Sequence, residues 1–131
     1  MISSKKNISP ERAKALTAFA KNISIKFSNL NLLQLAFTHR SCLQDGKLNH
    51  HENNERLEFL GDSVLGMATA AYLYEHFMDN PEGDLAKIKS AVVSEQALAP
   101  IALEIGIDKM LLLGKGEEMS GGRHGSYNIW H

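Results

Sequence analysis

The stretch ENNERLEFLGDSVLGMATAAYLYEHF, residues 52–77, is the longest segment of this 131-residue chain whose pattern predicts one uninterrupted helix. Asn53 or Asn54 can cap its first turn, and no proline follows before Pro81. We therefore expect a helix from these asparagines to about Met78, with the rest of the chain arranged around it.

The two sides of this helix differ in chemistry when the residues are placed on a wheel at about 100° per residue. One side, which we expect to face the core, is apolar and comprises Leu57, Leu60, Val64, Met67, Ala68 and Ala71. The opposite side carries Glu55, Glu58 and Asp62 within about 60° of one another, and we call these three residues the carboxylate stripe.

The carboxylate stripe brings like charges together at spacings of three and four, which costs a few tenths of a kcal/mol per pair. Most such charge runs are solvated helix faces. Here, however, an aromatic residue, Phe59, stands beside the acids, and Gly61 and Gly66 suggest that something approaches the backbone closely. Clustered carboxylates on a rigid helix also suit Mg²⁺. From the residues alone, a solvated face and a divalent-metal site both remain open.

Helical signals also precede the long segment. Ser9 and Pro10 predict a helix start, and the helix should reach about Lys21 with Leu16, Phe19 and Ala20 inward. A second helix is predicted over residues 32–39, capped by Asn31, with Leu32, Leu35 and Ala36 recurring at helical spacing. Residues 41–54 are polar, contain the turn signal Asp45–Gly46, and predict a loop.

Two further helices are predicted after the break at Pro81 and Gly83. The first covers about residues 84–93, and the second is capped by Ser94 and stopped by Gly106. Pro100 should kink or split the second of these helices because proline lacks an amide hydrogen. No convincing alternation predicts a sheet. The fold class is therefore all-α, with five helices.

Composition excludes several classes of protein. The net charge is −1, so bulk charge does not draw the chain to nucleic acid or to an anionic membrane. A single cysteine, Cys42, allows no internal disulfide, and no apolar run approaches the roughly 20 residues that span a bilayer. LGKGEE around Lys115 lacks the order of a phosphate-binding loop, so no nucleotide cofactor is expected. We expect a cytoplasmic protein without a membrane partner.

Four segments, in order, resemble the ribonuclease III family. They are LAFTHRS (35–41), NNERLEFLGDSVL (53–65), EGDLAKIKSAVVSEQALA (82–99) and LLLGKGEEMSGGR (111–123). The resemblance implies a helical nuclease domain over residues 1–123 that cleaves double-stranded RNA as a homodimer. It also implies Mg²⁺ as the cofactor, with Mn²⁺ as a possible substitute, and a role in processing ribosomal and messenger RNA precursors.

The resemblance also implies roles for five residues. Glu58 and Asp62 match metal-ligand positions, and Asp62 matches a carboxylate that is essential for cleavage. Glu55 and Glu82 match acids that line the RNA cleft between subunits. Phe59 matches an aromatic residue that inserts into a socket on the partner subunit.

The carboxy-terminal end departs from the family pattern. The family has a second acid pair, an Asp and a Glu three residues later, on a helix after the GGR block, whereas residues 124–131 read HGSYNIWH and contain no carboxylate. We interpret residues 124–131 as a non-family tail and expect that the double-stranded-RNA-binding domain of many members is absent. On this interpretation the chain is a truncated or frameshifted version of a longer protein. We therefore expect weak Mg²⁺ binding, little cleavage and marginal stability.

Two other interpretations remain. A non-catalytic dimerisation or RNA-binding module could keep the nuclease fold without the second acid pair, and a truncation product could have no role of its own. Lys87 and Lys89 could touch RNA phosphate or simply belong to an exposed helix face. His39 is interpreted as a packed structural histidine, and His50 and His51 as solvated loop residues.

Overall fold

The computed structural model describes residues 8–43 and 51–125. Within them the chain forms these helices: α1 Pro10–Asn22, α2 Leu30–Ala36, α3 Glu55–His76, α4 Glu82–Val92, α5 Glu95–Glu104, α6 Ile107–Met110 and α7 Lys115–Met119, with short 3₁₀ turns at Arg40–Leu43 and Gly122–His124. The predicted all-α class is confirmed. None of the helices so described is both long and apolar enough to cross a membrane.

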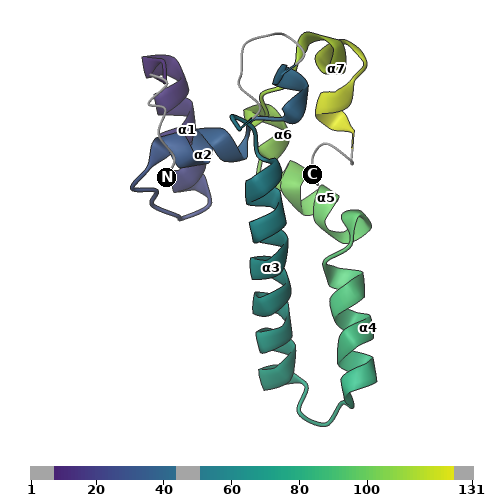
Figure 1. The fold of residues 1–131 in the computed structure, drawn as a ribbon. Helices are drawn as coiled ribbons and strands as arrows, with labels where there is room; N and C mark the ends of the chain where they lie inside the picture. The colour runs from purple at the N-terminus through teal and green to yellow at the C-terminus, as the bar shows by residue number, and fades with distance from the viewer. Residues whose placement is uncertain (1–7, 44–50, 126–131) are drawn as a thin grey trace.

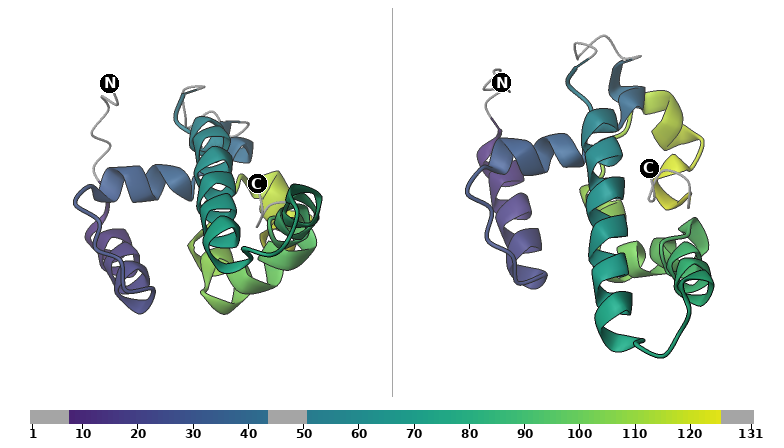
Figure 2. Two further views of the ribbon diagram at one scale, coloured as in Figure 1. Left: turned by 90° about the horizontal axis from the view of Figure 1, so that it is seen from below. Right: turned by 60° about the horizontal axis from the view of Figure 1, so that its bottom comes forward.

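The helices are arranged around α3, the longest of them. Figure 1 shows α3 and α4 as an antiparallel hairpin that extends away from the rest of the chain, with the connecting turn at its far end. In both views of Figure 2, the α1–α2 pair lies on one side of α3 and the α4–α5 pair lies on the other. The two amino-terminal helices are therefore separated from α4 by the full width of α3.

Helix α1 forms as the sequence predicts. The Ser9 side chain accepts a hydrogen bond from the amide of Arg12 at 3.2 Å, and Pro10 occupies the first helical position. Leu16, Phe19 and Ala20 are the buried residues of the helix. The prediction of both its start and its inward face is confirmed.

Helix α2 begins earlier than predicted. Asn29, not Asn31, is its cap, and its side chain accepts from the amides of Asn31 and Leu32. Leu33 is the buried residue of the helix, whereas Leu32 and Leu35 are half-buried and Ala36 is exposed. The predicted Asn31 cap is therefore wrong, because two asparagines two residues apart offer the same signal and packing selects between them.

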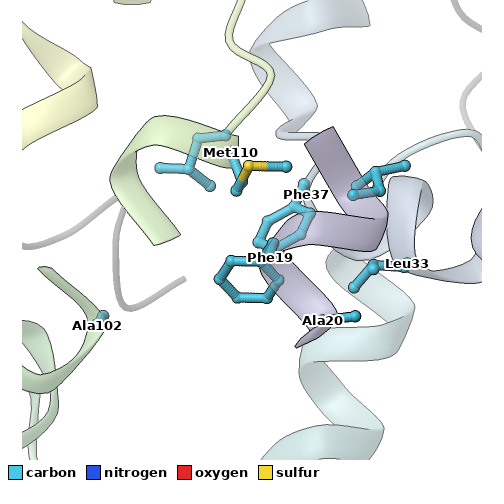
Figure 3. Close-up of a cluster of buried hydrophobic side chains, with 8 residues drawn as sticks. Phe19, Ala20, Leu33, Phe37, Ala102 and Met110 are labelled. Carbon is cyan, nitrogen blue, oxygen red and sulfur yellow. The ribbon is translucent and has the colours of Figure 1, made fainter. Parts of the chain in front are cut away.

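The core lies where α1, α2 and α6 meet. Phe19 and Phe37 stand edge to face with their ring centroids 5.1 Å apart. Figure 3 shows the two side chains next to each other in this cluster. Met110 of α6 belongs to the same cluster, and Leu16 is its most deeply buried residue. Arg12 joins the three helices, because Nε donates to Gln34 at 2.7 Å and Nη2 donates to the Met110 carbonyl at 2.6 Å.

Pro100 does not split α5 into two helices, whereas the kink predicted as the alternative stays a prediction. Ser94 caps α5 by accepting from the amide of Ala97, as expected, and the helix then runs through Pro100 to Glu104. Proline removes one helical hydrogen bond, that to the carbonyl of Gln96. Both Pro100 and Gln96 are exposed, so water can reach this carbonyl. The loss of a single solvated bond does not end the helix.

The predicted core face of α3 is also wrong. Leu60, Val64 and Met67 are exposed, Met67 by 70%, and Ala68 and Ala71 are exposed as well. Helix α3 instead packs against α4 through the side that carries the carboxylate stripe. The covered or half-covered residues on that side are Leu65, Gly66, Thr69 and Leu73. A helical wheel identifies residues that share a face, but it does not determine which face the chain covers.

Candidate functional site

The amino-terminal end of α3 is fixed by two buried asparagines. Asn54 donates its side-chain amide to the Ala36 carbonyl at 3.0 Å, and its backbone amide donates to the Thr38 carbonyl at 2.9 Å. Asn53 Oδ1 accepts from the amide of Glu55 at 3.0 Å. The two asparagines therefore divide the predicted capping role, and they anchor the start of the carboxylate stripe to the end of α2.

The three stripe residues differ in their surroundings. Glu55 is exposed and lies 3.5 Å from Arg40 Nη1, an ion pair of low strength in water. Glu58 is half-buried and Asp62 is exposed. Glu58 and Asp62 lie one helical turn apart on the same side of α3. The arrangement places two carboxylates side by side on a helix whose first turn is firmly held.

This pair fits a hard divalent cation only in part. Among the residues that the structure describes, no three His, Cys, Asp or Glu side chains are close enough together to hold a metal ion. Mg²⁺ is commonly bound through one or two carboxylates, with waters and substrate phosphates completing its octahedron. Glu58 and Asp62 match that requirement, and the chain supplies no third ligand from its described part.

The single chain does not bring Glu82 to the carboxylate stripe. Glu82 is the first residue of α4 and lies at the far end of the α3–α4 hairpin, beyond the last turn of α3 (Figure 1). Asp62 is separated from the end of α3 at His76 by about 21 Å at 1.5 Å per residue. A shared cleft containing both acids would require a second subunit and stays a prediction.

Phe59 lies in the open beside the stripe. Its side chain is 81% exposed, although phenylalanine is normally among the most buried residues. It adjoins the exposed apolar side of α3 formed by Leu60, Val64 and Met67. Exposed apolar patches of this kind mark interaction surfaces. The surroundings of Phe59 are compatible with the predicted contact to a partner subunit, which stays a prediction.

The two glycines of α3 behave differently. An added methyl group would meet no atom within 4 Å at Gly61, whereas at Gly66 it would lie 3.6 Å from Cε and Nζ of Lys89. The expected close approach is therefore not found at Gly61, and at Gly66 an added methyl group would be in ordinary van der Waals contact with the end of a lysine side chain. Lys89 was not distinguished from Lys87 by sequence, because only the packing of α4 on α3 separates the two lysines.

His39 is buried and hydrogen-bonded next to this site. Its Nδ1 lies 2.7 Å from Ser41 Oγ and accepts the Ser41 amide at 3.2 Å, while Ser41 Oγ accepts from the amide of Gly114 at 2.8 Å. Burial lowers the pKa of His39 below its ordinary 6.5, opposed by the carboxylates of Glu117, Glu55 and Glu58 and reinforced by Arg40. The interpretation of His39 as a packed structural histidine agrees with this geometry.

We expect the chain to lose stability in mild acid because of His39. Its pKa is lower in the folded state, so below pH 6.5 the unfolded chain binds the additional proton and acid favours unfolding. The loss can reach about 1.4 kcal/mol per pH unit until the folded-state pKa is passed. Urea unfolding of the parent and of His39→Gln at stepped pH measures it. Parallel pH dependence in both proteins would contradict the assignment to His39.

Gly114 is a residue that sequence analysis missed. A methyl group there would overlap the Ser41 carbonyl oxygen and would lie 2.7 Å from its carbonyl carbon. The backbones of the 3₁₀ turn Arg40–Leu43 and of the start of α7 therefore touch. Arg123 supports the same region by donating Nη1 to the carbonyls of Asp108 and Leu111, both at 2.8 Å. The only hint of this contact in the sequence was the first of the two glycines in LGKGEE.

Comparison with protein families and curated proteins gives a consistent result. The family described as Ribonuclease-III-like matches residues 29–129. A "Ribonuclease 3" of Treponema denticola is 55% identical over 119 residues, covering 91% of this chain and 48% of that protein. A "Ribonuclease 3" of Treponema pallidum is 48% identical over 123 residues, covering 92% of this chain and 48% of that protein. The chain thus spans about half the length of these curated relatives.

Solved structures agree with the sequence comparison. The nuclease domain of ribonuclease III from Campylobacter jejuni, described with flexibility in a region involved in dimer formation, matches with a TM-score of 0.77 at 35% identity, covering 86% of this chain and 74% of that one. A crystal structure of the same domain has a TM-score of 0.76 at 34% identity and covers 95% of this chain and 76% of that one. The helical arrangement described above is therefore similar to that of a nuclease domain.

Proposed function

Because the chain belongs to the Ribonuclease-III-like family, we propose that it is the nuclease domain of an endoribonuclease that hydrolyses phosphodiesters of double-stranded RNA. The observation that carries the proposal is the pairing of Glu58 and Asp62 on one side of the anchored helix α3. The proposed protein is cytoplasmic, processes precursor RNA, and acts as a homodimer through the exposed face that includes Phe59.

Glu58 and Asp62 are the residues proposed to hold the metal ion. Mg²⁺, or Mn²⁺ in its place, would supply a Lewis acid for a phosphoryl oxygen and a bound water of lowered pKa. Two carboxylates on a rigid helix balance the ion's two positive charges and leave other coordination positions for water and RNA. Asn53 and Asn54 fix the position of both carboxylates, because they hold the first turn of α3.

Glu55 and Glu82 are proposed to line the cleft that the duplex occupies in a dimer. Both acids are exposed, and within one chain they lie at opposite ends of the α3–α4 hairpin. Duplex RNA would be selected by shape and by contacts across the minor groove, since side chains cannot read its deep major groove. The proposal therefore predicts little dependence on base sequence.

A second candidate function is a non-catalytic module that keeps the nuclease fold. The observation that favours it is the absence, within the described part of the chain, of any group of three potential metal ligands. Two protein ligands hold a divalent ion less firmly than a site in which further protein oxygens replace its bound waters. The two candidates differ in whether Asp62 binds a metal ion at all.

We expect Asp62→Asn to abolish the weak metal binding of the chain. The substitution keeps the shape of the side chain and removes the charge that a divalent cation needs. Mn²⁺ binding followed by electron paramagnetic resonance measures the site, and cleavage of duplex RNA in Mg²⁺ is followed in parallel. The parent should bind Mn²⁺ weakly and cleave slowly, and the variant should do neither.

Asp79→Asn is the matched control for this experiment, because Asp79 is an exposed acid in the turn after α3. It should leave metal binding and cleavage as in the parent. Equal Mn²⁺ binding by the parent and the Asp62 variant would contradict the metal site and favour the non-catalytic module. Rapid turnover by the parent would instead contradict the expectation that two carboxylates make an incomplete site.

A further inference from the structure

Lys89 lies across α3 at the position where that helix lacks a side chain. A methyl group on Gly66 would be in ordinary contact, 3.6 Å away, with both Cε and Nζ of Lys89. Gly66 and Lys89 are half-buried, whereas Lys87 on the same helix is exposed. The end of the Lys89 side chain therefore lies against α3 at Gly66. Its ammonium group is on the side of α3 that faces α4.

That side is the one that carries the carboxylate stripe. Asp62 precedes Gly66 by one helical turn, and residues at this spacing have Cβ positions about 5–6 Å apart. Lys89 takes part in no ion pair with any residue of the described part of the chain, and neither does Asp62. No ion pair within the described part of the chain therefore occupies the partly covered ammonium group or the carboxylate one turn from Gly66.

We propose that Lys89 is a positioning residue that binds a phosphate of the RNA strand lying on the carboxylate stripe. The inference rests on the proposed function, because it concerns the same site. Glu58 and Asp62 together balance the two charges of one divalent ion, and Glu55 already pairs with Arg40, so the stripe with its ion leaves no net positive charge to attract a phosphate strand. The ammonium group of Lys89, one helical turn from Asp62, supplies the missing attraction and holds the RNA strand against α3.

The alternative is that Lys89 only covers apolar surface with its stem, as lysines often do. Lys89→Met separates the two roles, because methionine keeps an unbranched stem and removes the charge. Lys89→Arg keeps both the unbranched stem and the positive charge. Lys87→Met is the matched control, since it removes the same charge from the same helix at an exposed position.

The experiment measures binding of a short fluorescent RNA duplex by anisotropy in Mg²⁺ over a series of salt concentrations, with gels to confirm that the duplex remains intact. Lys89→Met should weaken binding about five-fold at low salt, as expected for one unit charge near a phosphate in water. It should also lower the slope of log K against log salt by about 0.9, the release of one counterion. Lys89→Arg should bind as the parent does.

The outcomes separate this inference from the proposed function. A parent chain that does not bind duplex RNA overturns both. A parent that binds, with Lys89→Met equal to the parent or no weaker than Lys87→Met, overturns the role of Lys89 and leaves the nuclease proposal in place. Binding by Lys89→Arg that is as weak as that of Lys89→Met would show that positive charge is not what the position supplies.

Discussion

Replacing Gly114 with alanine is expected to lower the free energy of unfolding by about 2–4 kcal/mol, a large part of the margin of a small domain. The added methyl group would overlap the backbone of Ser41, which no side-chain rotation can relieve. Separating the two segments would also break the hydrogen bond from the Gly114 amide to Ser41 Oγ. Urea unfolding monitored by circular dichroism measures the loss.

Gly116 provides the matched control for this substitution. It lies two residues further along LGKGEE, inside α7, and a methyl group there meets nothing within 4 Å. Gly116→Ala should be neutral or stabilising by up to about 1 kcal/mol, because alanine has the higher helix propensity. If both variants unfold at the same urea concentration as the parent, the contact between Gly114 and Ser41 does not support the fold.

Sequence alone was sufficient for the helices whose signals are local. Ser9 at the start of α1, Asn53 at the start of α3 and Ser94 at the start of α5 each accept a hydrogen bond from an amide two or three residues further along. Such bonds depend on neighbouring residues only, so a sequence pattern can specify them. The short helices α6 and α7 were not predicted, because elements of four or five residues have too few positions to show a period.

Sequence was insufficient wherever a distant segment decides the outcome. Asn29 and Asn31 are equally good caps for α2, and Leu33 packing into the core selects the first. The covered side of α3 depends on where α4 returns, so the apolar side proved exposed. The same limit applies to the predicted site residues. Glu58 and Asp62 are adjacent because one helix carries both, whereas the position of Glu82 depends on the hairpin.

Replacing Phe59 with alanine is expected to weaken self-association of the chain by about 30-fold or more, the effect of losing a hot-spot aromatic of about 2 kcal/mol. Phe59 is 81% exposed next to the carboxylate stripe, and Leu60 and Val64 on the apolar side of α3 are left in solvent by the described part of the chain as well. A second copy that covers this face would remove all three from water, and a large aromatic ring contributes most of that area. Sedimentation equilibrium over a concentration series measures the dimer dissociation constant.

The choice of control decides whether this effect belongs to α3. Met119 on α7 is 88% exposed and apolar, yet it lies outside the exposed apolar side of α3, so Met119→Ala should leave the dissociation constant unchanged. Phe59→Leu should fall between the parent and the alanine variant, because it retains part of the buried area. A chain that stays monomeric at every concentration, or equal weakening by Phe59→Ala and Met119→Ala, would exclude Phe59 as a dimer contact. Since Glu82 can reach a carboxylate stripe only on another subunit, such a result would also remove Glu82 from the proposed RNA cleft.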